Sequence, residues 1–379
     1  MAFIGLGKID VNLIPMLIGC IFCFLNRLLN QYDGALLFKN EIITNVYLSF
    51  GRMFALIPFI ILIIRSKRVH NNEIQNRKKN NSIKYIYFDK KENITQGKWK
   101  FILFSAIIFF IESIFFVMTF KIKTNCWIWY IVIASLFYYL IFNKKLFKHH
   151  YLSAASIILL GLVIDLSKEN LQNDVTNNLL LLLLRYLREI LLSFHNVITK
   201  YIMEKKFCSS SEITFYNGLI NVVLFVIFAI LDYNYFGFDN YDEYFTNFNS
   251  TELLVALGEM TTQFGLFLTI LITIRKNTPC HIFIIFVIGQ FAYYIDNDIS
   301  GISILVLICL IVIFFLALIF NEIIEINILG LSYNTKKNIQ ARSERESLEI
   351  MIITKDETMD DNLERDEVLI DLPNTEIIE

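Results

Sequence analysis

Ten long runs of apolar residues, separated by shorter polar stretches, dominate the pattern of the chain. The runs have 16 to 23 residues each, close to the about 17–25 residues that a helix needs to cross a bilayer. Apolar residues follow one another without the period-two alternation of a membrane β-barrel. The pattern therefore predicts an all-α polytopic membrane protein with ten transmembrane helices, over residues 11–29, 42–64, 101–120, 126–142, 151–166, 178–199, 213–231, 253–274, 279–295 and 299–320.

Charged residues are almost absent from these runs. Of the 34 Lys and Arg and 36 Asp and Glu, only eight lie inside them. The chain is 55% hydrophobic and 18% charged, against roughly 45–50% and about 25% in soluble domains. This composition excludes a soluble enzyme and a disordered chain. The formal net charge of −2 gives no general attraction to nucleic acid, so the lipid bilayer is the predicted surrounding.

The basic residues of the loops predict the orientation in the membrane. If the amino terminus is cytoplasmic, the cytoplasmic loops between the runs carry 18 Lys and Arg and the opposite loops carry 4. Cytoplasmic loops of membrane proteins carry such an excess of basic residues. Both termini are therefore predicted to be cytoplasmic, together with a flexible loop over residues 65–98 and a polar, disordered tail over residues 334–379.

The chain also contains a weak internal repeat. Residues 119–129 align without gaps on residues 273–283 at an offset of 154, and the aligned pairs include Thr119 with Thr273 and Cys126 with Cys280. Transporters are often built from two repeats with the binding site between them. We predict a first five-helix half over residues 1–166 and a second over 178–333. Because five is odd, the halves would have opposite orientations.

Several short motifs carry a family resemblance: Gly19-Cys20-Ile21 leading to Arg27, the loop Lys144-Lys145-Leu146-Phe147-Lys148-His149-His150-Tyr151-Leu152, the stretch Tyr201-Ile202-Met203-Glu204-Lys205, and Phe320-Asn321-Glu322-Ile323-Ile324. Over about residues 11–335 the chain resembles the EamA-like drug/metabolite transporter superfamily. It is most similar to the nucleotide-sugar-transporter-like branch, solute carrier family 35 of the F type. The resemblance implies ten helices in two inverted repeats, alternating access and nucleotide sugars as the best-known cargo. It also implies a location in an intracellular endomembrane (Golgi, ER or lysosome/vacuole). A homodimer is compatible with the resemblance.

The chain departs from this family at two places. Where the family has a basic residue early in the fourth span, this chain has Trp127-Ile128-Trp129. Where the family has an acidic-basic pair in the ninth span, this chain has Cys280-His281-Ile282-Phe283. These differences put the family's substrate in doubt and support an alternative, a non-transporting scaffold that kept the fold.

Polar residues inside the runs are the candidates for a binding site, because a charge at mid-membrane costs about 2.5–3.5 kcal/mol on insertion scales. The sixth run carries a stripe at helical spacing, Arg185, Arg188, Glu189, His195, Asn196 and Thr199. One interpretation is the wall of a central cavity, in which the arginines offer forked donors to a phosphate or carboxylate. The alternative is a structural Arg185–Glu189 pair, with Arg188 reaching the membrane interface.

Arg52 lies near the middle of the second run, with no acidic residue one turn away. Glu112 in the third run is its natural partner. The two are either a structural ion pair or an anion receptor and a proton-coupling carboxylate. Glu259 and Gln263 form a second polar patch in the eighth run. For Asn217 in the seventh run, a hydrogen bond to a neighbouring helix is favoured over one to a ligand.

Together these residues predict a secondary transporter of a small polar, anionic metabolite, either nucleotide-sugar-like or an organic phosphate. The expected substrate-binding residues are Arg52, Arg185, Arg188, Asn26, His195, Asn196, Asn217 and Gln263, with Glu112 and Glu259 as coupling or pairing carboxylates. A proton-coupled carrier of cationic or weak-base solutes is a further alternative, in which these two glutamates bind the substrate.

No catalytic, cofactor or metal motif stands out. Cys20 and Cys23 have metal-site spacing but lie in an apolar run without a second ligand pair, which favours packing. The adjacent His149 and His150 lie in a predicted cytoplasmic loop and lack other ligand types, so anchoring of the loop to a helix is preferred over metal binding. We therefore expect neither an enzyme nor a cofactor.

Overall fold

The computed structural model describes residues 4–5, 13–30, 40–65, 97–119, 126–143, 146–166, 179–237, 241–246, 249–296, 304–326, 335 and 338. The chain divides into two compact units, Met1–Ile326 and Asn327–Glu379. All elements considered below belong to the first unit. Most of the loop predicted over 65–98 and of the tail predicted over 334–379 lies outside the described residues.

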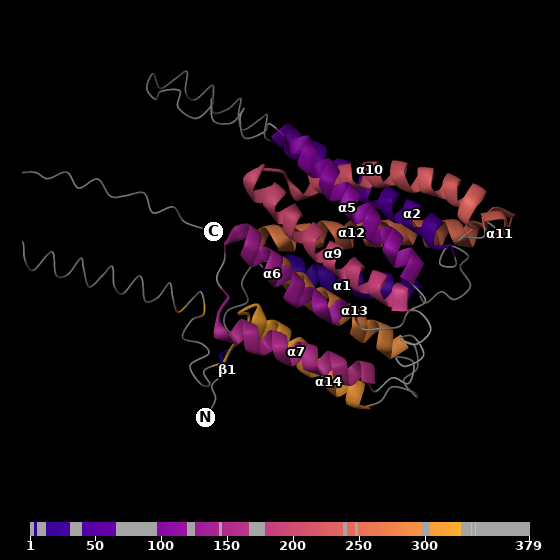
Figure 1. Ribbon diagram of the computed structural model, residues 1–379. Coiled ribbons are helices and arrows are strands. Elements are labelled where there is room, and N and C mark those ends of the chain that lie inside the picture. Colours follow the sequence, from indigo (N-terminus) through magenta and orange to yellow (C-terminus); the bar gives the residue numbers. More distant parts are fainter. Residues whose placement is uncertain are drawn as a thin grey trace, which may run out of the picture. The chain divides into compact units, whose positions relative to one another are not determined.

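The described part of the first unit is helical, apart from one short antiparallel strand pair, in which Ile4 of β1 (Ile4–Gly5) lies opposite Ile326 of β2 (Glu325–Ile326). Residues 1–166 contribute α1 (Ile14–Asn30), α2 (Glu41–Met53), α5 (Lys98–Thr119), the 3-10 turn η3 (Cys126–Trp129), α6 (Tyr130–Phe142) and α7 (Lys148–Leu166) (Figure 1). Residues 178–326 contribute α9 (Leu179–Lys205), α10 (Ser210–Leu231), the π-helical turn η4 (Asp232–Phe236), α11 (Tyr241–Thr246), α12 (Ser250–Lys276), the 3-10 turn η5 (Pro279–His281), α13 (Ile282–Asp296) and α14 (Ile304–Phe320).

Within the described residues, each predicted apolar run contains a helix, with ends displaced by up to several residues. Four helical segments are long and apolar enough to cross a membrane: Glu41–Arg65, Lys98–Thr119, Ser210–Phe236 and Ser250–Lys276. Four shorter apolar helices cover Ile14–Asn26, Cys126–Phe142, Pro279–Phe291 and Ile304–Phe320. These features are those of a helical membrane protein. The number of helices that cross the membrane stays a prediction.

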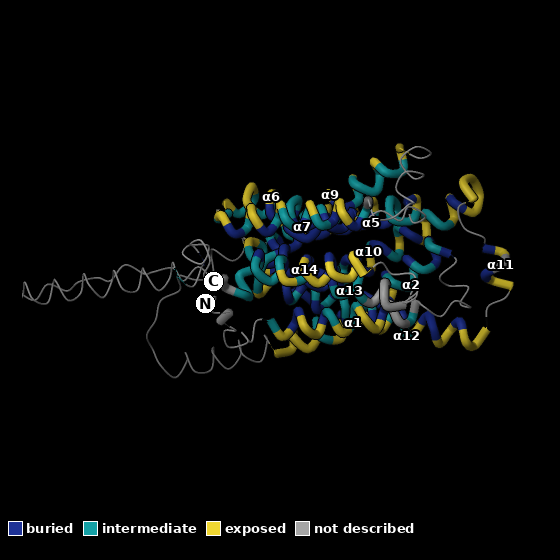
Figure 2. Tube along the Cα trace, turned by 90° about the horizontal axis from the view of Figure 1, so that it is seen from below, coloured by how far each residue is buried: buried dark blue, intermediate teal, exposed yellow. Residues whose placement is uncertain are grey.

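Large apolar side chains are exposed along the helices. Leu180 is 70% exposed, Leu254 69% and Ile304 76%, and exposed residues recur along α14 (Figure 2). Soluble monomers rarely expose contiguous apolar surface of this kind. The outward faces of the helices are therefore suited to lipid.

The helices pair across the two predicted halves of the chain. α1 packs on α12 and α13, α2 on α10 and α12, and α5 on α9 and α10. α6 packs on α9, and α7 lies beside α14 (Figure 1). Every one of these contacts joins a helix of residues 1–166 to a helix of residues 178–333. The interior of the unit is therefore built from both halves.

The second apolar run is not one uniform helix. α2 ends at Met53, residues 54–55 form a turn, and a helix resumes over residues 56–65. Pro58 explains the break, because proline has no N–H to donate to the carbonyl of Phe54 and its ring crowds that carbonyl. Arg52 thus lies in the last turn of α2, immediately before the break.

Candidate functional site

A cavity of about 230 Å³ lies between α2, α5, α9, α12 and α13. Its walls include Phe109, Phe116, Phe267 and Phe286. Six of the residues predicted for the binding site line it together: Arg52, Glu112, Arg188, His195, Asn196 and Gln263. The cavity therefore combines an aromatic lining with a small set of convergent polar groups, which is the usual composition of a small-molecule site.

Two glycines bring the backbones around Arg52 close together. A Cβ atom on Gly51 would collide with the backbone oxygen of Met260 in α12. A Cβ atom on Gly218 in α10 would lie 2.8 Å from the backbone oxygen of Ser49 and 2.9 Å from the Cβ of Arg52. Small residues permit such close crossings between membrane helices. α2 is thus held between α10 and α12 at the turn that carries Arg52.

The guanidinium of Arg52 is buried against aromatic rings. Its Cζ lies 4.1 Å from the ring centroid of Phe109 and 4.4 Å from that of Phe267, and the residue is only 5% exposed. Its Nε and Nη1 have no hydrogen-bond partner among the described residues. Cation–π contacts offset part of the desolvation of an arginine but satisfy none of its N–H donors in the plane. Arg52 is therefore a buried cation with donors to spare.

The sequence-based pairing of Arg52 with Glu112 is wrong as an ion pair. Glu112 instead accepts from Arg188, whose Nε lies 2.7 Å from the Glu112 Oε1. Nη1 of the same arginine donates to Glu189 Oε1 at 2.9 Å. Arg188 therefore bridges two carboxylates. The reason is geometric, because α5 packs along α9 but makes little contact with α2.

The alternative pairing of Arg185 with Glu189 is also not the one formed. Glu189 bonds Arg188, while Nε and Nη1 of Arg185 have no hydrogen-bond partner among the described residues. The Arg185 Cζ lies 5.6 Å from the Phe116 ring centroid. Of the charged residues that line the cavity, Arg52 and Arg188 face one carboxylate, Glu112, which leaves an excess of one positive charge when all three groups are ionised.

A chain of hydrogen bonds holds Asn196 in the wall of the cavity. Asn196 Nδ2 donates to the hydroxyl of Tyr130 at 3.0 Å, and that hydroxyl donates to the Pro279 carbonyl at 3.1 Å. This chain connects α9, α6 and η5. His195 packs between the rings of Phe109 and Phe267, at centroid distances of 5.3 and 6.4 Å.

The remaining predicted site residues do not line the cavity. Asn26 in α1 donates to Glu259 Oε1 in α12 at 2.7 Å, and Gln263 Nε2 lies 3.5 Å from the same oxygen. This patch joins α1 to α12, with Gln263 reaching from it to the cavity. Asn217 is fully buried in α10, and Arg185 lies beside Phe116 as described.

Sequence reasoning missed the aromatic part of the site. Phe109 and Phe267 carry the contacts to Arg52, yet their residue type alone does not distinguish them from the other 33 phenylalanines of the chain. Their helical spacing was a usable signal, because Phe109 precedes Glu112 by three residues and Phe267 follows Gln263 by four. Residues at these spacings share a helix face.

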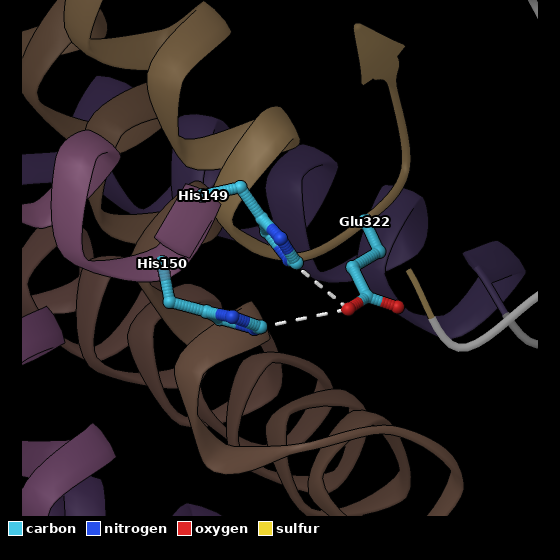
Figure 3. A group of neighbouring side chains, drawn as sticks. All are labelled: His149, His150 and Glu322. Atoms are coloured by element: carbon cyan, nitrogen blue, oxygen red, sulfur yellow. Dashed lines mark hydrogen bonds and ion pairs between the residues drawn. The ribbon is translucent and has the colours of Figure 1, made fainter. Parts of the chain in front are cut away.

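A second polar cluster lies outside the cavity, where α7 begins and α14 ends. His149 Nε2 lies 3.1 Å from Glu322 Oε1, and His150 Nε2 lies 3.9 Å from the same oxygen (Figure 3). The expectation that the histidine pair lacks another ligand type is therefore wrong. Glu322 is 173 residues away from His149 in the sequence, so no local pattern could pair them.

Glu322 occupies an unusual backbone position. It follows α14 with a φ of 56°, its N–H donates to the Ile319 carbonyl at 3.0 Å, and the Ile323 N–H donates to the Leu318 carbonyl at 2.9 Å. These two bonds form a Schellman motif, whose left-handed position is normally glycine or asparagine. The left-handed conformation costs other residues roughly 1–2 kcal/mol.

No protein-family model matches the chain, and no curated protein matches its sequence.

Proposed function

We propose that this protein is a secondary membrane transporter of a small anionic metabolite, working by alternating access between its two halves. The observation that carries the proposal is the state of Arg52. It lines a cavity between helices of both halves, is almost fully buried, and has two nitrogens without a hydrogen-bond partner among the described residues. Intramembrane ionisable residues facing a cavity mark substrate or ion pathways in many membrane proteins.

The charge of the cavity favours an anion. With Glu112 paired to Arg188, the excess positive charge of the cavity lining remains with Arg52. A guanidinium binds phosphate and carboxylate groups through two parallel hydrogen bonds. The same excess argues against the carrier of cationic solutes, because its proposed receptor Glu112 is already paired and Glu259 lies outside the cavity lining.

The size of the cavity favours a small anion. Its volume of about 230 Å³ is below the roughly 300–1,000 Å³ of sites for drug-sized ligands. A short organic phosphate or carboxylate fits this volume better than a nucleotide sugar does. The nucleotide-sugar cargo and the endomembrane location rest on the family resemblance alone.

The helix pairing supports the ten-span, inverted-repeat part of the proposal. Suppose that α1, α2, α5, α6 and α7 correspond in order to α9, α10, α12, α13 and α14. If each helix is then replaced by its counterpart, an observed contact becomes another observed contact. The contact of α5 with α9 corresponds to that of α12 with α1, that of α6 with α9 to α13 with α1, and that of α5 with α10 to α12 with α2. The aligned Cys126 and Cys280 also both lie in 3-10 turns that lead into a helix.

The test is counterflow from liposomes that contain the purified full-length chain. The panel comprises inorganic phosphate, short organic phosphates, dicarboxylates, nucleotide sugars and amines. We expect exchange of a small phosphate or carboxylate and none of amines. Arg52→Ala should abolish this exchange, since it removes the cation whose Nε and Nη1 have no partner among the residues that the structure describes. Exchange that is unchanged in Arg52→Ala would contradict the receptor role.

Arg65→Ala is the matched control, because Arg65 is an exposed arginine at the end of the segment that follows α2. It should leave exchange unchanged. Failure of the wild-type chain to exchange any member of the panel would favour the non-transporting scaffold.

A further inference from the structure

The cluster of His149, His150 and Glu322 gathers three groups that can each ligate a metal ion. One potential ligand atom from each residue lies within 4.8 Å of the others, and the two imidazoles and the carboxylate converge in Figure 3. His149 is only 3% exposed, and its Nδ1 has no hydrogen-bond partner among the described residues. A buried imidazole with one nitrogen aimed at the cluster is a prepared ligand, because its desolvation has already occurred.

We propose that His149, His150 and Glu322 form a binding site for a divalent transition-metal ion, Zn²⁺ in the first place, which joins the start of α7 to the end of α14. Two imidazole nitrogens and one carboxylate oxygen are a ligand set that Zn²⁺ accepts, with the fourth tetrahedral position open to water. This inference is independent of the proposed transport function, since the cluster shares no residue with the cavity.

The distances suit a small ion after a modest adjustment. Zinc ligands at about 2.0–2.2 Å in a tetrahedron lie roughly 3.3–3.6 Å from one another. The His149 Nε2 to Glu322 Oε1 distance of 3.1 Å is already close to this range. The His150 Nε2 to Glu322 Oε1 distance of 3.9 Å needs to shorten by less than an ångström. Hard cations such as Mg²⁺ and Ca²⁺ are disfavoured because they prefer oxygen ligands.

The backbone of Glu322 gives independent support. A glutamate at the left-handed position of a Schellman motif is strained, whereas glycine there would not be. Residues held in such conformations concentrate at functional sites. Here the strain has a direct consequence, because this backbone position directs the carboxylate toward both histidines (Figure 3).

Two hydrogen bonds must change when the ion binds. The Phe147 N–H donates to His150 Nδ1 at 3.2 Å, which places the proton of a neutral ring on Nε2. Coordination through Nε2 therefore requires His150 to carry its proton on Nδ1 and to release the Phe147 amide to water. For His150, the exchange costs one ordinary hydrogen bond and gains a coordination bond. His149 changes in the same way, because its Nε2 gives up the hydrogen bond to the Glu322 carboxylate and its ring proton moves to Nδ1.

The experiment uses the full-length chain in detergent without a polyhistidine tag. After removal of metals with a chelator, Zn²⁺ is titrated in competition with a chromophoric chelator. We expect one equivalent of tightly bound Zn²⁺ per chain. His149→Gln and Glu322→Gln should each weaken the binding at least 100-fold. Equal affinity in these variants and the wild type, or absence of binding by the wild type, would overturn the proposal.

Two further variants separate metal binding from folding. His281→Gln is the matched control, because His281 is buried like His149 and accepts a backbone N–H at a helix start, from Thr278, as His150 does from Phe147. It should leave the affinity unchanged. Glu322→Gly removes the carboxylate but relieves the left-handed strain, so it should lose Zn²⁺ binding while the helix end stays folded.

X-ray absorption at the zinc edge tests the wild-type ligands without any variant. The expected spectrum contains two imidazoles and only oxygen otherwise. Sulfur in the first shell would place the ion at cysteines and refute the site.

Discussion

Two arginines line the same cavity, but one is paired with carboxylates and the other is not. Arg188 in α9 donates to Glu112 and to Glu189, at 2.7 and 2.9 Å. Arg52 in α2 faces the rings of Phe109 and Phe267, and two of its nitrogens have no hydrogen-bond partner among the described residues.

The difference teaches which buried charge is structural and which is available. A buried arginine whose donors are taken by two carboxylates stabilises the helix pair that carries them. A buried arginine that rests on aromatic faces keeps its in-plane donors for another group. Hence the two residues should respond differently to the same kind of substitution.

The largest effect is expected for Arg188→Leu, which leaves Glu112 and Glu189 buried without their cation. Breaking a buried ion pair by removing one partner typically costs about 3–5 kcal/mol. The free energy of unfolding in detergent should fall by that amount, as measured by denaturant or thermal unfolding. Arg188→Lys, which keeps the charge, should lose less. A loss below about 1 kcal/mol for Arg188→Leu would show that the bridge is not structural.

An intermediate effect is expected for Gly218→Ala, where the added Cβ would meet Ser49 and Arg52 at 2.8 and 2.9 Å. Overpacking of this kind costs typically about 1–3 kcal/mol, and it displaces the turn that carries Arg52. Unfolding should therefore occur at a lower temperature. Gly258→Ala is the control, since its nearest neighbour atom is 3.4 Å away, and alanine in a helix interior gains about 0.5–1 kcal/mol over glycine. Equal behaviour of the two variants would contradict the close packing of α2 and α10.

The smallest effect on stability is expected for Arg52→Met. This change removes a cation that has two donors without a partner in the described part of the chain, and replaces it with an apolar side chain of similar length. The lost cation–π contacts and the relieved desolvation oppose each other, so the free energy of unfolding should change by less than about 1 kcal/mol. A loss as large as that of Arg188→Leu would mean that Arg52 is structurally paired, and the comparison would fail.

Rules that act within one segment of the chain predict much of this fold. Continuous apolar runs placed helices correctly, because a helix that faces lipid must be apolar over nearly its whole length. The cost of burying charge singled out Arg52, Glu112 and Arg188, all of which line one cavity. The same rules failed for their partners, because pairing depends on how helices are rotated and how closely they approach. They failed for Glu322 as well, whose contact with His149 spans 173 residues.

The sequence by itself thus determined the helices and the small set of charges that must be buried among them, since both follow from hydrophobicity and its period along one segment. Only the tertiary structure decided that Glu112 pairs with Arg188, that two Arg52 donors find no partner within the described ranges, and that a carboxylate meets the histidine pair. Small residues such as Gly51 and Gly218 set the distances between helices. Those distances, which no single segment encodes, select one partner for each charge.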